Sequence, residues 1–260
     1  MNLTKWFDDI PACIDGKSLP IERIHTLEEI LLDRFGKDIV VESIIRLKSK
    51  KNTVVHLKAS NFDSKEIDMV AKMFIEGNYE NELSILTSSL AHGLSVPEVL
   101  DARDNVILMT FIPGEVFVDR INHTFEPVLV EKLAMWYYKY HSTHRQIKAD
   151  PRLRNFIYHT DRVFGVDFEE SHPGHWMTDI GGICASLLDT NPIFDSRKRD
   201  LSWHLLDTYL SLLGRERDST IETMFNTTIA ETLKQTSIWR NDEKILQLSE
   251  LIEKDGLPHD

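Results

Sequence analysis

The chain is poor in cysteine, with only Cys13 and Cys184 among its 260 residues. Two thiols cannot form a disulfide framework and are too few for a four-thiolate zinc site, so we expect a cytoplasmic protein in a reducing compartment. Long apolar runs are also lacking: Val106–Met109 and Trp136–Tyr138 are far shorter than the roughly 20 residues that cross a bilayer. The N-terminus has no cationic start followed by an apolar stretch. The sequence therefore predicts neither a signal peptide nor a membrane protein.

Positive charge is scarce as well. The chain has 30 Lys and Arg residues but 42 Asp and Glu residues, which gives a net charge of −12. This balance argues against a broad basic surface for duplex nucleic acid. The hydrophobic content of 42% and the chain length are sufficient for a real core, built as one bilobal unit or as two small domains.

The first half of the chain is predicted to be rich in strands. Thr26–Phe35 has the pattern of a short amphipathic helix, with Thr26 as its N-cap and Gly36 as its stop. Short β-branched segments separated by polar turns follow, and a second helical segment interrupts them. The expected elements are strands at Ile39–Leu47, Thr53–Ala59 and Ile67–Phe74, a helix at Tyr79–Leu90, and strands at Val99–Leu100 and Val106–Phe111 around a turn at Asp101–Asn105.

The second half is predicted to be mainly helical after a Pro-Gly break at 112–115. The expected elements are a helix at Pro127–His144, short strands at Phe156–Tyr158 and Val163–Val166, and helices at Ile180–Leu188, Lys198–Leu213, Thr220–Lys234 and Asp242–Ile252. We therefore predict an α+β protein. Its parts are an N-terminal extension with a short helix (1–36), a β-rich lobe (37–112) and a helical lobe (113–260).

Three polar residues of the second half have the spacing of a phosphoryl-transfer site. Asp150 is followed five residues later by Asn155, and Asp167 follows the next pair of short strands. Phosphoryl transfer needs a base that orients the acceptor hydroxyl, and oxygen ligands for Mg²⁺. It also needs a cation that binds the phosphates. Earlier in the sequence, Lys72 on the predicted third strand and Glu82 on the following helix are suitably placed for this role.

In this order and spacing the sequence resembles the protein-kinase-like superfamily. It is most similar to the aminoglycoside/choline-kinase-like phosphotransferases and to small atypical kinases, over about Ile39 to Asp179. The resemblance implies a bilobal protein-kinase-like fold. Its N-lobe would be a five-stranded antiparallel sheet with a helix, its C-lobe would be mostly helical, and ATP and Mg²⁺ would be its cofactors.

For the N-lobe, the resemblance implies that Lys72 holds the α- and β-phosphates of ATP and that Glu82 pairs with it, with Glu80 as the competing partner. Met109 would occupy the gatekeeper position. The backbone from Thr110 to Ile112 would contact the adenine.

For the C-lobe, the resemblance implies that Asp150 is the catalytic base and that Arg152 lies near the γ-phosphate. Asn155 and Asp167 would be the Mg²⁺ ligands. Asp179 resembles the residue that braces the catalytic loop from below, and His141 also matches the small-molecule kinase pattern.

The sequence departs from the family pattern in three places. The turn between the first two strands contains no glycine, so phosphate contact would fall to Ser49, Lys50 or Lys51. Lys148 stands where the pattern has a structural histidine, which puts the rigidity of the loop in question. The metal motif ends in Glu169 rather than glycine, as in the aminoglycoside-type enzymes.

Each of these residues also has a purely structural interpretation. Asp150 and Asn155 are common turn formers, Lys72 and Glu82 are common on solvated surfaces, and Asp179 is a suitable helix N-cap. Arg152 and Arg154 can also be interpreted as ordinary surface charges. The aromatic cluster Trp136–Tyr138 and the thiol of Cys184 are expected in the core.

The short segment between Asp167 and Asp179, residues 168–178, leaves no room for a long activation loop. We therefore expect a kinase that phosphorylates a hydroxyl of a small molecule, and the negative net charge fits a cationic acceptor. One alternative is a small atypical serine/threonine protein kinase that works in a complex, with the acidic tail Glu243–Asp260 as a docking face. The other is a pseudokinase that binds nucleotide or a protein partner.

Overall fold

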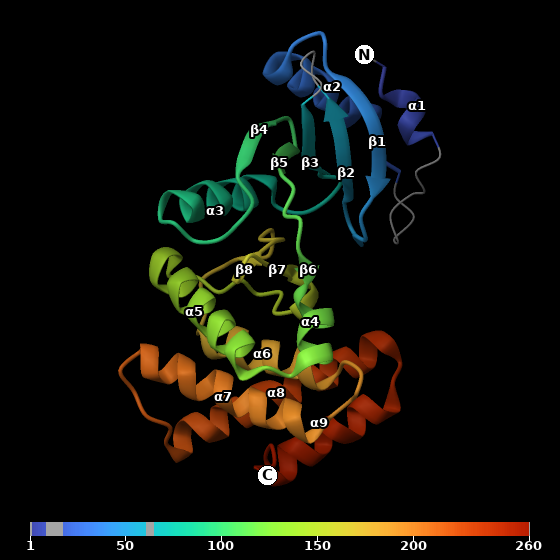
Figure 1. The fold of residues 1–260 in the computed structure, drawn as a ribbon. Coiled ribbons are helices and arrows are strands. Elements are labelled where there is room, and N and C mark those ends of the chain that lie inside the picture. Colours follow the sequence, from blue (N-terminus) through green and yellow to red (C-terminus); the bar gives the residue numbers. More distant parts are fainter. Residues whose placement is uncertain (1, 9–17, 61–64, 260) are drawn as a thin grey trace. The chain divides into compact units, whose positions relative to one another are not determined.

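The computed structural model describes residues 2–8, 18–60 and 65–259, and Cys13 lies outside this part. The chain divides into two compact units (Figure 1). Unit 1 consists of Met1–Ala91 and Pro97–Ile112, and unit 2 consists of His92–Val96 and Pro113–Asp260.

Unit 1 is built on a five-stranded antiparallel sheet with the strand order β1-β2-β3-β5-β4, which confirms the predicted sheet (Figure 1). In β2 the alternate residues Thr53, Val55, Leu57 and Ala59 are buried, and of the residues between them only His56 is buried, as expected for a strand that packs mainly on one face. The strands are β1 (Val40–Arg46), β2 (Thr53–Ser60), β3 (Glu66–Met73), β4 (Val99–Arg103) and β5 (Val106–Thr110).

Two features of unit 1 differ from the expectations. The helix α2 (Ile21–Phe35) begins five residues before Thr26, which is buried inside the helix, so the prediction of Thr26 as its N-cap was wrong. The predicted stop is confirmed, because the N–H of Gly36 caps the helix at φ +85°. Strand β4 extends to Arg103, so the turn occupies only Asp104 and Asn105.

The core of unit 1 lies between α2 and the sheet. Leu27, Ile30 and Leu31 of the helix are fully buried in one cluster with Leu57 of β2 and Leu108 of β5. Burying each such side chain contributes about 1.5–3 kcal/mol relative to leaving it exposed. Among the described residues, the segment predicted as an N-terminal extension supplies six of the fifteen buried residues of this core. The remaining helices of the unit are α1 (Thr4–Phe7) and α3 (Tyr79–Ala91).

Unit 2 combines a small sheet with the helices that follow it. The sheet has the order β6-β7-β8, and α5 has the predicted bounds. The elements are β6 (Glu115–Val116), α4 (Phe117–Thr124), α5 (Pro127–His144), the 3-10 helix η1 (Leu153–Asn155), β7 (Phe156–His159), β8 (Arg162–Gly165), α6 (Met177–Leu188), α7 (Ser196–Leu212), α8 (Ser219–Arg240) and α9 (Glu243–Asp255).

Helix α6 is the central element of unit 2, because nearly all of its side chains are buried. Cys184 lies inside this helix, and burial raises the pKa of its thiol to about 12, so it is a packing residue as predicted. A second part of the core surrounds Trp136, which stacks on Tyr140 and meets Phe156 edge to face. Trp136 and Tyr137 are thus in the core as predicted, whereas Tyr138 is only half-buried.

Within the described ranges, no helix combines the length and the apolar character that a membrane span requires.

Candidate functional site

Unit 1 contains a buried ion pair between β3 and α3. The Nζ atom of Lys72 lies 2.6 Å from Oε2 of Glu82, and both side chains are less than one-tenth exposed. The same Nζ lies 4.8 Å from the centroid of the Phe74 ring. The structure therefore pairs Lys72 with Glu82 and not with Glu80. It also rules out the interpretation of both residues as solvated surface charges.

The turn between β1 and β2 holds the residues expected to replace a glycine-rich loop. Ser49 is half-buried and Lys50 is exposed. The turn is anchored by Asn52, which is buried and whose Oδ1 accepts hydrogen bonds from the amides of Ile75 (2.9 Å) and Glu76 (3.1 Å). A side-chain amide thus fixes the start of β2 to the segment that precedes α3.

The end of β5 carries the expected adenine-contacting segment. Met109 is buried in the sheet, opposite Val70 of β3. The amide of Thr110 donates to the carbonyl of Glu98 (2.9 Å), and its hydroxyl accepts from the amide of Glu98 (3.0 Å). The N–H of Phe111 donates to the carbonyl of Asp68 (3.4 Å), so the amides of Thr110 and Phe111 are both used. The next backbone donor for a ligand is therefore the N–H of Ile112.

In unit 2, the loop before β7 brings three predicted residues together. The Nδ2 atom of Asn155 donates to Oδ2 of Asp150 (2.8 Å), and Nε of Arg152 lies 2.9 Å from its Oδ1. The Asp150 side chain is only about a quarter exposed. Both carboxylate oxygens of Asp150 are therefore held in place by side chains two and five residues farther along the same loop.

Asp167 lies beside this group because Val166, the residue before it, is hydrogen-bonded to the loop. The amide of Val166 donates to the carbonyl of Asn155 (2.9 Å). Asp167 itself has φ +65°, in the left-handed region that non-glycine residues adopt at a cost. Since the Nδ2 atom of Asn155 donates to Asp150, its Oδ1 is the atom left to accept a hydrogen bond or to ligate a metal. An amide oxygen and a carboxylate are hard ligands suited to Mg²⁺.

Asp179 holds the loop from below. Its carboxylate accepts hydrogen bonds from the backbone amides of Lys148 (2.6 Å) and Ala149 (3.0 Å). His141 of α5 contacts the same carboxylate (2.9 Å) and joins it to the hydroxyl of Tyr209 on α7 (2.7 Å). Asp179 is fully buried in the first turn of α6, whose N-cap is Trp176, so the interpretation of Asp179 as a mere N-cap was wrong.

Lys148 occupies the position of the expected histidine and is fully buried. Its Nζ donates to the backbone carbonyl of Asp167 (2.6 Å) and lies 5.2 Å from the centroid of the Phe168 ring. The lysine thereby ties the loop that carries Asp150 to the segment that begins at Asp167.

Gly182 of α6 permits the closest approach between the loop and the central helix. A Cβ atom at this position would lie 2.4 Å from Cγ of Pro151, whose ring cannot move aside as a flexible side chain would. We expect Gly182→Ala to destabilise the protein by about 1–3 kcal/mol through overpacking. Thermal denaturation checks this, with Thr178→Ala, at an exposed position of the same helix, as the control. Equal melting temperatures for the two variants would contradict it.

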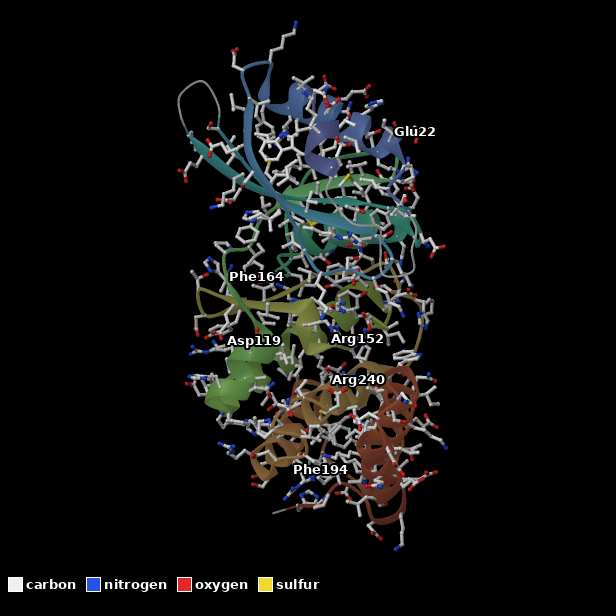
Figure 2. The ribbon with its side chains drawn as sticks, turned by 90° about the vertical axis from the view of Figure 1, so that its right-hand side faces the viewer. Glu22, Asp119, Arg152, Phe164, Phe194 and Arg240 are labelled. Carbon is white, nitrogen blue, oxygen red and sulfur yellow. The ribbon has the colours of Figure 1, made fainter. Side chains whose placement is uncertain are left out.

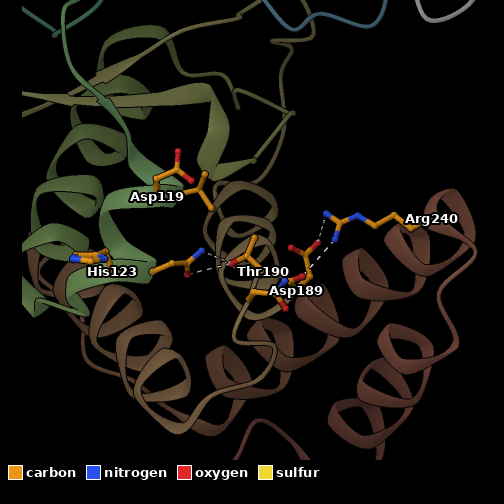
Figure 3. Close-up of a pocket in the computed structure, with 8 residues that line it drawn as sticks. Asp119, His123, Asp189, Thr190 and Arg240 are labelled. Atoms are coloured by element: carbon orange, nitrogen blue, oxygen red, sulfur yellow. Dashed lines mark hydrogen bonds and ion pairs between the residues drawn. The ribbon is translucent and has the colours of Figure 1, made fainter.

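A polar cavity of about 560 Å³ opens in unit 2 between α4 and the end of α6 (Figure 3). Asp119 and His123 line it from α4, and Asp189, Thr190 and Arg240 line the other side. The Nη2 atom of Arg240 lies 2.9 Å from Oδ2 of Asp189. In the described part of the chain the other oxygen, Oδ1, is buried without a hydrogen-bond partner.

Burial raises the pKa of the Asp189 carboxyl from 3.8 to about 6, although Arg240 opposes the shift. Between these values the folded protein binds a proton that the unfolded chain does not. The contribution of the Asp189 carboxyl to the free energy of unfolding is therefore more favourable near pH 5 than near pH 8. We expect Asp189→Asn to raise the melting temperature more at pH 8 than at pH 5. A gain that is equal at both pH values, or larger at pH 5, would contradict this expectation.

Sequence reasoning missed Asn52, the pocket around Asp189, and the role of Lys148 as a link. Asn52 carried a weak signal, since it is the last polar residue before a strand. Asp189 carried none, because it ends a helix and meets Arg240 only through the tertiary fold.

The fold resembles solved small-molecule kinases. An amicoumacin kinase in complex with AMP-PNP and Ca²⁺ superposes with a TM-score of 0.60 at 14% identity, over 92% of this chain and 97% of that chain. A choline/ethanolamine kinase family protein from Mesorhizobium loti gives 0.58 at 14% identity, over 83% and 90%. An ethanolamine kinase from Plasmodium vivax gives 0.57 at 12% identity, over 98% and 91%. These likenesses confirm the protein-kinase-like fold.

No curated protein matches the sequence. The family model of the RIO domain matches residues 39–174, just over half of the chain. That segment begins just before β1 and ends before α6, so it spans the Lys72–Glu82 pair, the Asp150 loop and Asp167. The chain therefore belongs to the RIO domain family.

Proposed function

We propose that the protein is an ATP- and Mg²⁺-dependent phosphotransferase that moves the γ-phosphoryl group to a hydroxyl of a small molecule. The observation that carries the proposal is the carboxylate of Asp150, oriented by Asn155 and Arg152 on a loop fixed by Asp179. An oriented carboxylate of this kind suits a base that accepts a hydroxyl proton.

In the proposed reaction, the acceptor oxygen forms a bond to the γ-phosphorus while the bond to the β–γ bridging oxygen breaks and ADP leaves. Asp150 receives the proton of the hydroxyl. Arg152 stands two residues away with a planar guanidinium that can stabilise phosphoryl oxygens. Asn155 and Asp167 would hold Mg²⁺, which neutralises phosphate charge when it is bound.

In unit 1, Lys72 would bind the α- and β-phosphates, and Glu82 would hold its side chain in one rotamer. Ser49 and Lys50 would contact phosphate from the turn, with Asn52 fixing the base of that turn. Met109 and the backbone of Thr110 and Ile112 would form the adenine contact, with Ile112 as the amide donor.

Nucleotide binding is tested by thermal denaturation with ATP in the presence and absence of Mg²⁺. A ligand at 100 times its Kd stabilises a protein by about 2.7 kcal/mol, and we expect a rise of the melting temperature that requires the metal. Asn155→Ala and Asp167→Ala should lose the metal-dependent part of the rise. A melting temperature that ATP·Mg²⁺ leaves unchanged would contradict the proposal.

The second candidate function is a kinase that phosphorylates a protein. The match to a protein-kinase-like domain family favours it. The likeness to small-molecule kinases favours the first candidate. ATP consumption that rises with a metabolite library but not with protein substrates would decide for the small molecule.

A further inference from the structure

A tryptophan with a largely exposed ring stands beside the loop that carries Asp150. Trp239 lies in the last turn of α8 and is 64% exposed. Its ring centroid lies 5.3 Å from the guanidinium carbon of Arg152, which is the distance of a cation–π contact. Because most of the ring is exposed, Trp239 adds little to the core, whereas its contact with Arg152 is made at the candidate site.

The end of α8 is anchored to the central helix of unit 2. The guanidinium of Arg240, the residue after Trp239, is paired with the carboxylate of Asp189 at the end of α6 (2.9 Å). Asn241 then ends α8 in the left-handed conformation, at φ +51°. The side chains of Arg152 and Arg240 can be followed in Figure 2, one from the loop and the other from α8. The backbone that carries the indole ring is therefore held against the end of α6.

The loop that carries Arg152 is anchored to the same helix. The amide of Leu153 donates to Oγ of Ser186 in α6 (3.2 Å). Pro151 packs so closely on Gly182 that a Cβ atom there would lie 2.4 Å from its Cγ. The arginine and the indole ring thus come from two segments that are both fixed to α6, so their contact does not depend on a mobile terminus.

The guanidinium of Arg152 is held at two points. Its Nε atom lies 2.9 Å from Oδ1 of Asp150, and its carbon lies over the ring of Trp239. A contact at the Nε edge alone would leave the guanidinium free to turn, since 37% of this side chain is exposed. The flat ring restricts that rotation, because a planar guanidinium packs against an aromatic face. The Nη groups then keep one direction while the Nε edge stays beside the carboxylate.

Resting on the proposed function, we propose that Trp239 is a positioning residue of the active site, which holds the Arg152 guanidinium beside Asp150 with its Nη groups ready for the γ-phosphoryl group of ATP. Arg152 would donate charge-assisted hydrogen bonds to the phosphoryl oxygens. Trp239 acts through Arg152 by reducing the freedom that the guanidinium loses when the nucleotide binds. The residue lies in α8, outside the segment 39–174 that the RIO domain model matches. The C-terminal helices of this chain therefore complete its active site.

The test measures the affinities of the full chain for AMP-PNP and for ADP by titration calorimetry, both in the presence of Mg²⁺. The two nucleotides differ in the γ-phosphoryl group, so the ratio of their Kd values reports the contact made by Arg152. The variants are Arg152→Gln, Trp239→Ala, Trp239→Phe and the double variant Arg152→Gln/Trp239→Ala. Ile238→Ala is the matched control, because it removes an equally exposed apolar side chain (66%) from the same turn of α8.

Arg152→Gln should reduce the preference for AMP-PNP over ADP about tenfold or more, since a charge-assisted hydrogen bond is lost. Trp239→Ala should reduce it about two- to fivefold, which is the effect of a cation–π contact at an exposed site. Trp239→Phe should restore part of the preference, and Ile238→Ala should leave it unchanged. In the Arg152→Gln background, Trp239→Ala should have no further effect, because its role depends on the guanidinium. All variants should melt close to the wild type.

A preference that Trp239→Ala or Arg152→Gln leaves at the wild-type value would overturn the inference while the proposed function stands. A loss of the same size in Ile238→Ala, or a further loss on adding Trp239→Ala to Arg152→Gln, would also overturn it, since the effect would then not pass through the guanidinium. If the wild type binds neither nucleotide, the proposed function fails, and the inference fails with it.

Discussion

Replacing Asp150 by Asn is expected to lower kcat by about 10²–10⁴-fold, the usual contribution of a positioned general base. The side chain keeps its size and stays within reach of Arg152, but an amide cannot accept the hydroxyl proton. Because Asp150 is partly exposed and outside the core, the fold should persist. The stabilisation by ATP·Mg²⁺ should persist as well, and ATP consumption with an acceptor measures the loss.

The control for this prediction is Asp200→Asn, which removes an exposed carboxylate from α7. It should match the wild type in kcat and in melting temperature. A kcat of Asp150→Asn that stays within a few-fold of the wild type would show that another group accepts the proton.

Replacing Lys72 by Met is expected to have the largest combined effect on stability and activity. Removing one partner of a buried ion pair costs about 3–5 kcal/mol, because a charge that was compensated is left in a poorly solvated place. The loss of the phosphate-binding cation should also lower kcat/KM by about 10²–10³-fold. Urea denaturation measures the first effect, and steady-state kinetics at varied ATP concentration measures the second.

The double variant Lys72→Met/Glu82→Leu separates the two effects. Replacing both members by apolar side chains should recover most of the lost stability. It should not recover activity, because the cation is still missing. Lys58→Met, on the exposed face of the neighbouring strand β2, is the matched control and should change neither quantity. Restored activity in the double variant would contradict the role assigned to Lys72.

The fold was predictable because its signals are local. The strands of unit 1 are short β-branched segments separated by polar turns, and α5 begins with Pro127 at its first turn and carries one apolar stripe. The start of α2 was missed because Pro20, which is its N-cap, carries no side-chain capping signal, and Thr26 offered a stronger one inside the helix.

The contacts within the candidate site were predictable where the two residues are close in the sequence. Asp150 and Asn155 are five residues apart and meet within one loop, and Lys72 and Glu82 meet across one strand-to-helix connection. The pairing of Asp189 with Arg240 joins residues that are 51 positions apart. No periodic pattern links such residues, so the polar cavity could be found only in three dimensions.

The central claim is that this chain transfers a phosphoryl group from ATP to a small hydroxyl compound with Asp150 as the base. A metabolite library screened by ATP consumption, with wild type and Asp150→Asn side by side, tests it most directly. The account predicts at least one small-molecule acceptor that raises ATP consumption by the wild type in a Mg²⁺-dependent way and leaves Asp150→Asn nearly inactive. ATP·Mg²⁺ binding without turnover of any small molecule or protein would contradict it and identify a pseudokinase.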